Sequence, residues 1–416
     1  MSYLSRIILP ATALLAAAAT APALANPGTQ PPASGVAVPG PGPGESSSRH
    51  VRLETIERRG AGFIARLEGG AVAELTLDPR LQGAAEDVFR EFRIPYGAAV
   101  VISIPDGKIL ALAGRSTVSP DLGPAELTLQ AWAPAASVFK LVSATALVEG
   151  GLSGQSRICY HGGVSSVVPD NLIDIPRIDQ SCATLAYGIG KSQNAIVAKL
   201  VTIHLTPDKL DHVARAFGFG QVIPFDVPVE PSHIDVPTGD RLEFARTAAG
   251  FWHSTLSPLH AALLAATVAN RGEMPTPRII ERATGNDGQP MVVRGASSRA
   301  VMTPAVAGEV GRMMELTTRI GTAKGTFNDK KGRRILPVSV AGKTGTLSAE
   351  TDKGYVGYSW FIGYAPADHP QIAFAVALGN RASWRIKATY VGRRLVTEYL
   401  AGAREHGTSH LVAIAR

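Results

Sequence analysis

The sequence lacks the residue patterns that usually bind metals or nucleic acids. Its 10 histidines include no H-E-x-x-H arrangement, so His161, His253 and His260 are interpreted as structural residues, and no metal or other cofactor is predicted. The net charge of +7 is spread along the chain. Because the basic residues form no run with interleaved aromatics, a nucleic-acid partner is not expected.

A complete nucleotide-binding motif is also missing. Residues Gly342-Lys343-Thr344 resemble the end of a phosphate-binding loop, but Pro337 occupies the position of the required earlier glycine. Residues Gly188-Ile189-Gly190 begin like a dinucleotide fingerprint, but Gln193 occupies the third glycine position. Nucleotide chemistry is therefore not predicted.

Residues 1–25 have the composition of a secretory signal peptide. Arg6 precedes an Ala/Leu-rich run, which ends in the small-x-small sequence Ala23-Leu24-Ala25. Pro10 and Pro22 bracket this run, which favours cleavage after Ala25 over an uncleaved membrane anchor. The protein is thus expected to be exported to a periplasmic or other extracytoplasmic space. Residues 26–48 are rich in Pro, Gly and Ser and predict a linker, which would become a membrane tether if the signal stayed uncleaved.

Cysteine is scarce, since only Cys159 and Cys182 are present. Export and the even count favour a disulfide between them over two reduced, buried thiols. The bridge would close a loop of about 22 residues, and the loss of chain entropy in the unfolded state would stabilise the fold by about 3 kcal/mol. The loop would end ten residues before Ser192 and could brace that segment.

The sequence does contain a serine and lysine pair at the start of a helix-like stretch. The residues from Ser137 to Lys140 open an apolar run that Gly150-Gly151 ends, which predicts a helix over residues 137–149. Positions i and i+3 share a helix face, so the Ser137 hydroxyl and the Lys140 amine can meet. An amine whose pKa is lowered by burial or nearby positive charge can take the proton of a nucleophilic serine. The alternative is a buried serine beside a snorkelling lysine.

Two further motifs follow this pair in the chain. They are Ser192-Gln193-Asn194, and Lys343-Thr344-Gly345-Thr346 after the strand-like residues 338–341. Alone, Ser192 and Asn194 could equally cap a helix. The ordered set S-x-x-K, S-x-N and K-T-G, however, resembles the signature of the penicillin-binding proteins and active-site serine β-lactamases. Residues 75–82, 256–260, 269–272 and 360–366 resemble the same transpeptidase family, so the likeness covers about residues 73–402.

The resemblance implies an α/β (α+β) fold of the penicillin-binding-protein and β-lactamase type. This fold has an antiparallel sheet of about five strands flanked by helices, and a helical subdomain that meets the sheet at the active site. The residues agree, because apolar runs around turn residues predict hairpins over residues 97–113 and 358–378. Helical periodicity predicts further helices at residues 193–203, 207–217, 255–270, 303–319 and 390–400.

The predicted organisation is one transpeptidase domain over residues 75–402. It follows a short N-terminal segment, residues 49–74, which is either an extra hairpin or a remnant linker. A C-terminal tail of residues 403–416 ends the chain.

The resemblance also implies catalytic roles for the first two motifs. Ser137 would attack an acyl carbonyl and form an acyl-enzyme, and Lys140 would be the base for this step. Ser192 would sit beside Lys140 and relay a proton to the leaving amine. Asn194 would form a hydrogen bond with the backbone amide of the substrate.

The third motif would bind the substrate. Lys343 would help to hold the substrate carboxylate and lower the pKa of Lys140, while Thr344 and Thr346 would offer hydroxyls to the same carboxylate. Gly345 would leave room for substrate along the strand edge. The backbone N–H groups of Ser137 and Thr346 would form an oxyanion hole.

These roles imply a peptidoglycan D,D-transpeptidase or D,D-carboxypeptidase that acts on the D-Ala-D-Ala ends of stem peptides and binds β-lactam antibiotics. A serine β-lactamase is the main alternative. The β-lactamases that use a glutamate-activated water carry an E-x-x-L-N segment, which is absent, and those related to this domain usually have a hydrophobic residue where Asn194 stands. A non-catalytic antibiotic sensor or wall-binding scaffold is a third hypothesis. A sensor would normally need membrane helices and a signalling partner domain, and a scaffold would not need all three motifs intact.

Overall fold

The computed structural model of the protein describes residues 50–351, 354–383 and 385–405. The predicted signal peptide and linker, residues 1–48, lie outside the described residues, as do residues 406–416 of the predicted tail. None of the helices in the described part of the chain is long and apolar enough to cross a membrane.

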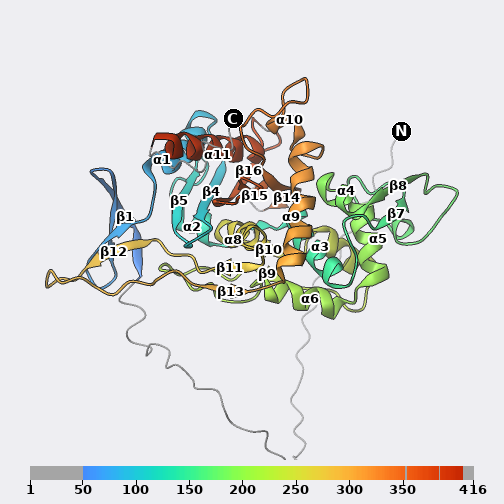
Figure 1. Cartoon of the computed structure of the whole chain (residues 1–416), viewed down its shortest axis with the longest axis horizontal. Helices are drawn as coiled ribbons and strands as arrows, with labels where there is room; N and C mark the ends of the chain where they lie inside the picture. The colour runs from blue at the N-terminus through green and yellow to red at the C-terminus, as the bar shows by residue number, and fades with distance from the viewer. Residues whose placement is uncertain (1–49, 352–353, 384, 406–416) are drawn as a thin grey trace, which may run out of the picture. The chain divides into compact units, whose positions relative to one another are not determined.

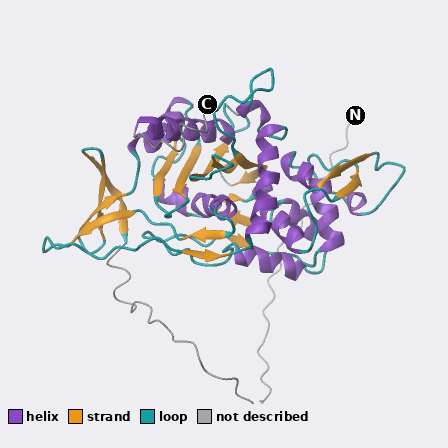
Figure 2. Cartoon of the chain, in the orientation of Figure 1, coloured by secondary structure: helices purple, strands orange, loops and turns teal. Residues whose placement is uncertain are grey.

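A five-stranded antiparallel sheet is the centre of the fold (Figures 1 and 2). Its strand order is β14-β15-β16-β4-β5, so strands from both ends of the described chain meet where β16 pairs with β4. The predicted sheet of about five strands and its two hairpins are thereby confirmed. Every residue of β16 is buried, as expected for a strand covered on both faces. The bounds are β4 Tyr96–Ser103, β5 Ile109–Ser116, β14 Ala341–Thr351, β15 Gly354–Ala365 and β16 Ile372–Asn380.

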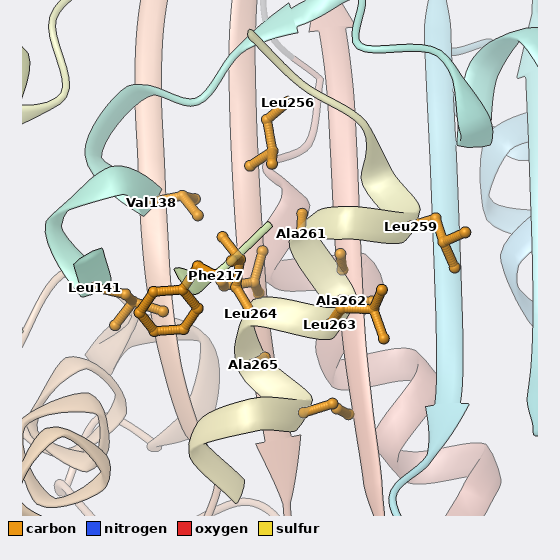
Figure 3. Packing of buried hydrophobic residues seen from close by; sticks show 14 of the residues in the cluster. Val138, Leu141, Phe217, Leu256, Leu259, Ala261, Ala262, Leu263, Leu264 and Ala265 are labelled. Atoms are coloured by element: carbon orange, nitrogen blue, oxygen red, sulfur yellow. The ribbon is translucent and has the colours of Figure 1, made fainter. Parts of the chain in front are cut away.

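One face of the sheet is covered by α8 (Pro258–Ala269), which contacts β4, β15 and β16. Apart from the buried His260 and Thr267, this helix is apolar on all sides, as expected for a helix enclosed by the core. Figure 3 shows Leu259 on one side of α8, and Val138, Leu141 and Phe217 on the other, where the sheet meets the helical part of the molecule. The predicted helix over 255–270 begins three residues late, because residues Ser254–Leu256 form a short strand, β10, instead.

The opposite face is covered by α1 (Pro79–Glu91) and α11 (Ala388–Glu405), which pack on each other and on the sheet (Figure 1). The predicted last helix, 390–400, is thus extended at both ends. Phe361 and Phe374 pack beneath α11 with ring centroids 5.5 Å apart. Gly392 is required here, since a Cβ at this position would lie 2.5 Å from the Phe361 ring.

The helical subdomain lies beside the sheet and carries the first two motifs. Threonine side chains cap α6 and α9 by accepting from the backbone of Lys209 and Val306, and a proline follows each cap. Its longer helices are α3 Lys140–Glu149, α5 Asn194–His204, α6 Pro207–Ala216, α7 Arg241–Ala249 and α9 Pro304–Arg319. The remaining short elements of the described chain, not all of which belong to this subdomain, are α2 Pro124–Leu129, α4 Leu185–Gly190, α10 Lys324–Phe327, β6 Ala133–Pro134, β7 Arg157–Tyr160, β8 Ser181–Thr184, β9 His233–Ile234, β11 Glu273–Pro275 and β13 Ser298–Ala300.

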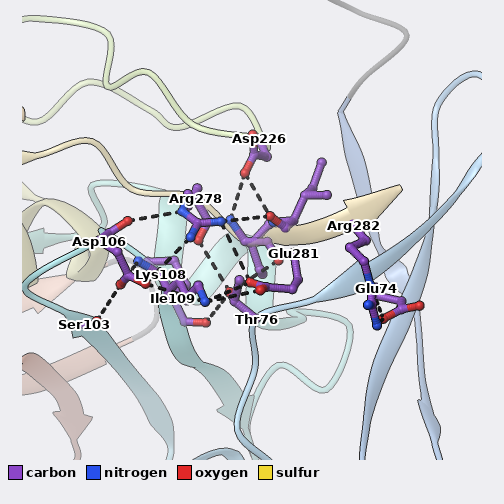
Figure 4. A network of polar contacts seen from close by, with 12 residues as sticks. Glu74, Thr76, Ser103, Asp106, Lys108, Ile109, Asp226, Arg278, Glu281 and Arg282 are labelled. Carbon is purple, nitrogen blue, oxygen red and sulfur yellow. Dashed lines mark hydrogen bonds and ion pairs between the residues drawn. The ribbon is translucent and has the colours of Figure 1, made fainter. Parts of the chain in front are cut away.

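The N-terminal segment, predicted to be either an extra hairpin or a remnant linker, forms three strands of a larger sheet. Its strands β1 (Val51–Arg59), β2 (Gly62–Leu67) and β3 (Val72–Leu75) are joined by β12 (Ile280–Thr284) in a four-stranded sheet. A polar network ties this sheet to the β4–β5 turn (Figure 4). In it, Arg278 donates to the backbone oxygen of Asp106 at 3.1 Å, and Lys108 pairs with Glu281 at 3.1 Å. Arg278 lies 172 positions from Asp106 in the chain, so sequence alone could not pair the two.

We expect Phe374→Ala to lower the free energy of unfolding by about 3–5 kcal/mol, because it empties a fully buried aromatic site. Denaturant unfolding followed by circular dichroism measures the loss. Phe92→Ala is the matched control, since Phe92 also has one aromatic partner at 5.5 Å but is only partly buried. An equal loss in both variants would contradict the placement of the core.

Candidate active site

The S-x-x-K motif lies on a strained turn. Residues Ala136–Phe139 form a 3₁₀ helix, η2, and Lys140 is the first residue of α3. The predicted single α-helix over 137–149 is therefore wrong in its first turn. The pairing survives because residues i and i+3 eclipse in a 3₁₀ helix, and the Ser137 Oγ lies 2.7 Å from the Lys140 Nζ. Ala136, which precedes Ser137 in this turn, has φ 49°. This value is uncommon for a residue other than glycine.

Lys140 is buried without a carboxylate among its hydrogen-bond acceptors. Its Nζ donates to the Asn194 Oδ1 at 2.7 Å and to the backbone oxygen of Ala249 at 2.6 Å, and it contacts the Ser137 Oγ at 2.7 Å. Complete burial lowers the pKa of Lys140 well below 10.5, and the positive charge of Lys343 lowers it further. The neutral amine is thereby favoured, and it can accept a proton from the Ser137 hydroxyl.

Ser192 contacts the lysine of the third motif. Its Oγ accepts from the Lys343 Nζ at 2.8 Å, whereas no described hydrogen bond joins it to Lys140. Asn194 takes the place beside Lys140 instead. Ser192 lies in the short connection between α4 and α5 and has a left-handed backbone conformation, with φ 55°. Asn194 thus forms the hydrogen bond with Lys140 and Ser192 forms one with Lys343, while the relay role of Ser192 stays a prediction.

Lys343 is fully buried, and its amine also donates to the backbone oxygen of Thr344 at 2.9 Å. Burial lowers the pKa of Lys343 from 10.5 to about 7. The K-T-G motif lies within strand β14 rather than after a strand. Because side chains alternate along a strand, Thr344 and Thr346 share one face, and both line the cavity described below. The Thr344 Oγ1 lies 2.5 Å from the Thr322 Oγ1.

Gly345 also allows the close packing of β14. It is buried, and a Cβ there would lie 3.3 Å from both Ala136 and Val138 and 3.1 Å from Trp360. The missing side chain therefore allows β14 to approach the turn that carries Ser137. This close approach sets the distance between the first and third motifs.

A second glycine at the site, Gly250, was not singled out from the sequence. It ends α7 with φ 87°, and a Cβ there would lie 2.1 Å from the Ala136 oxygen and 2.9 Å from the Ser137 nitrogen. The preceding Ala249 supplies the oxygen that holds Lys140. A glycine after an alanine pair is a helix C-terminus signal, but only the fold brings it to the nucleophile.

A cavity of about 560 Å³ joins the three motifs. Ser137, Ser192 and Asn194 line it, as do the two threonines of the third motif, while Lys140 and Lys343 are buried behind them. Further lining residues that sequence reasoning missed include Lys191, Thr322, Tyr355, Trp360, Lys387 and Thr389. Neither aspartate nor glutamate is found among the described lining residues.

The Cys159–Cys182 disulfide is present, which confirms that prediction. It joins β7 to β8 and closes a loop whose Val164 and Ser165 line the cavity. Of the three histidines interpreted as structural, His260 contacts the Phe217 backbone oxygen at 2.8 Å and His253 contacts a glutamate at 3.0 Å. Among the described residues, no group of three or more His, Cys, Asp or Glu could hold a metal.

Comparison with known proteins agrees with this geometry. The family profile described as "Penicillin binding protein transpeptidase domain" matches residues 97–394. The peptidoglycan D,D-transpeptidase PbpA of Mycobacterium tuberculosis is 27% identical over 382 residues, covering 82% of this chain and 74% of that protein. PbpA of Mycolicibacterium smegmatis is 26% identical over 355 residues, covering 77% and 70%.

Solved structures show the same likeness. The crystal structure of the M. tuberculosis protein has a TM-score of 0.66 at 25% identity, covering 80% of this chain and 83% of that one. The imipenem acyl-enzyme complex of penicillin-binding protein A from M. tuberculosis also has a TM-score of 0.66 at 25% identity, covering 80% of each chain.

The buried Lys343 predicts a stability that changes with pH. Its pKa is near 10.5 in an unfolded chain and about 7 in the folded protein, so the unfolded state binds more protons between these values. Stability should therefore rise with pH through that window and be lowest below it. We expect Lys343→Met to raise the thermal midpoint more at about pH 6 than at about pH 10, as measured by calorimetry.

Lys387→Met is the control, because Lys387 lines the same cavity but is exposed. Its effect on the midpoint should be the same at both pH values. A gain for Lys343→Met that is equal at the two pH values would show that burial does not shift this lysine.

Proposed function

The chain belongs to the penicillin-binding protein transpeptidase family, and on that premise we propose that it is an exported peptidoglycan D,D-transpeptidase that acts through an acyl-enzyme on Ser137. The proposed substrates are the D-Ala-D-Ala ends of stem peptides, with β-lactam antibiotics as inhibitors. The observation that carries this proposal is the 2.7 Å contact between the Ser137 hydroxyl and a fully buried lysine amine, in a cavity shared by all three motifs.

In the proposed acylation, the Ser137 Oγ attacks the carbonyl carbon between the two D-alanines and gives its proton to the neutral Lys140 amine. The backbone N–H groups of Ser137 and Thr346 are the proposed oxyanion hole, and a donor of this kind typically supplies about 3–4 kcal/mol. The bond to the leaving nitrogen then breaks and leaves a Ser137 ester. A β-lactam would follow the same course, with its ring nitrogen as the leaving group.

The leaving amine needs a proton, and Ser192 is the proposed donor. Its contact with Lys343, at 2.8 Å, supports a relay in which Lys343 replaces the proton that Ser192 gives up. Thr344 and Thr346 are proposed to bind the terminal carboxylate of the substrate, while the buried Lys343 attracts it by charge. Asn194 keeps one amide N–H for a substrate carbonyl, since its other groups contact Lys140 and Val164.

An acceptor amine would attack the ester in a transpeptidase, whereas water would in a carboxypeptidase or a β-lactamase. The relatives named D,D-transpeptidase support the first outcome. The lack of a carboxylate among the described residues of the cavity argues against a β-lactamase that uses a glutamate-activated water. Export rests on the predicted signal peptide, residues 1–25, and the domain boundaries 75–402 remain part of the same proposal.

We expect the protein to form a penicilloyl adduct that lasts minutes or longer, and Ser137→Ala to abolish it while the fold is retained. Intact mass measured over time after addition of a fluorescent penicillin tests both points, and circular dichroism checks the fold. Adduct formation in Ser137→Ala at the wild-type rate would refute the nucleophile. Rapid nitrocefin turnover that depends on Ser137 would instead indicate a β-lactamase.

We expect Lys140→Ala to slow acylation by about 10²–10⁴-fold, the usual contribution of a general base, with a much smaller effect on initial binding. Stopped-flow labelling over a range of penicillin concentrations separates the two quantities. Lys387→Ala is the control, because it removes a lysine from the same cavity that has no contact with Ser137. If both variants acylate at the wild-type rate, another residue is the base.

A further inference from the structure

The disulfide-closed loop, residues 160–181, holds the start of α5, and its Val164 and Ser165 line the cavity. Three consecutive backbone oxygens of the loop, those of residues 162–164, accept hydrogen bonds from Gln193 and Asn194. The Gln193 Nε2 donates to Gly162 at 3.2 Å. Asn194 donates twice, from its backbone nitrogen to Gly163 at 3.2 Å and from its Nδ2 to Val164 at 3.1 Å.

The contact to Val164 fixes which way the Asn194 amide faces. With its nitrogen end on the Val164 oxygen, its oxygen end is directed to the Lys140 amine, 2.7 Å away. The opposite orientation would place two donor groups against each other and two acceptors against each other. The loop therefore decides that Lys140 meets an acceptor at this position.

The loop approaches α5 closely because of two glycines. Gly162 and Gly163 have φ values of 55° and 69°, which other residues rarely adopt. A Cβ on Gly163 would lie 2.4 Å from the Ala195 side chain. The loop can therefore reach α5 only in one backbone conformation, and a further contact is needed to hold that conformation.

Lys199, five positions after Asn194 on the same helix, makes this contact and anchors the loop. Its side chain is 1% exposed, and its Nζ contacts the Asp179 Oδ2 at 2.8 Å and the Cys159 backbone oxygen at 3.0 Å. The other Asp179 oxygen contacts the His161 Nδ1 at 2.6 Å, directly before Gly162. Lys199 therefore reaches both ends of the loop, next to the disulfide.

The contacts of Asp179 favour its ionised form. Burial alone would raise its pKa, but hydrogen bonds from Lys199 and His161 and from the Ile175 backbone outweigh this and hold the pKa well below its usual range. By contrast, Asp174 also contacts Lys199 at 2.8 Å, but its side chain is 80% exposed. Water screens such a pair, so it should contribute little.

We propose that Lys199 and Asp179 are positioning residues for acylation, which act by clamping the loop so that the Val164 oxygen holds Asn194 against Lys140. This inference rests on the proposed acylation of Ser137. Neither residue touches the cavity, and neither belongs to the three motifs. A small displacement of a positioned group can slow a reaction by about 10²-fold, so the loss should appear in the acylation step rather than in binding.

The test is the double substitution Lys199→Met with Asp179→Asn, which leaves no unpaired buried charge. We expect the acylation rate at saturating fluorescent penicillin to fall by about tenfold or more, with the dissociation constant of the first complex little changed. The labelled fraction should still reach completion. Asp174→Asn is the matched control on the same loop and lysine, and it should acylate like the wild type.

Epistasis tests the route. In an Asn194→Ala background the anchor substitutions should slow acylation no further, and a full additional loss would overturn the route through Asn194. A wild-type rate in the folded double variant, or a reduced labelled fraction at the wild-type rate, would also overturn the proposal. If the double variant does not fold, Asp179→Asn alone gives the same test, since Asp174 remains to pair with Lys199. A wild-type protein that is not acylated would refute the proposed function instead.

Discussion

The burial of the Lys140 amine is the constraint on which the rest of the site depends. A charged ammonium is costly to bury, and among the described residues no carboxylate contacts this one, so the fold favours the neutral form. A second buried lysine, Lys343, adds to this bias by its charge. Burying these amines lowers stability below neutral pH, where they must carry charge. The same burial keeps Lys140 neutral, so that it can act as a base beside Ser137.

Three distant parts of the chain must come together to hold that amine. The nucleophile turn comes from the junction of β6 and α3, Asn194 begins α5, and Ala249 ends α7. The sheet closes the site through β14, which packs against the turn. Because β14 is an edge strand, one side of it carries no other strand and faces the helical part of the molecule.

The segments of the site are held together by close approach of one backbone to another, which glycines allow. Gly250 and Gly345 both lie against the turn that carries Ser137, and Gly163 lies against the start of α5. At Gly250 and Gly163 a side chain would displace the backbone of the nucleophile turn and of α5, and at Gly345 it would crowd the side chains of Ala136, Val138 and Trp360. The proposed loop anchor extends the same logic outward, because Lys199 and the disulfide fix a backbone segment whose oxygens then orient Asn194.

The sequence by itself determined the central hairpins, most of the long helices, the disulfide and the identity of the three motifs. These depend on local chemistry: apolar periodicity, turn residues, paired cysteines and short fixed spacings. Only the tertiary structure decided that Asn194 rather than Ser192 contacts Lys140, that Gly345 serves packing, and that residues 280–284 complete the N-terminal sheet. The reason is physical, since each of these depends on contacts between segments far apart in the chain, and local patterns contain no information about distance across the fold.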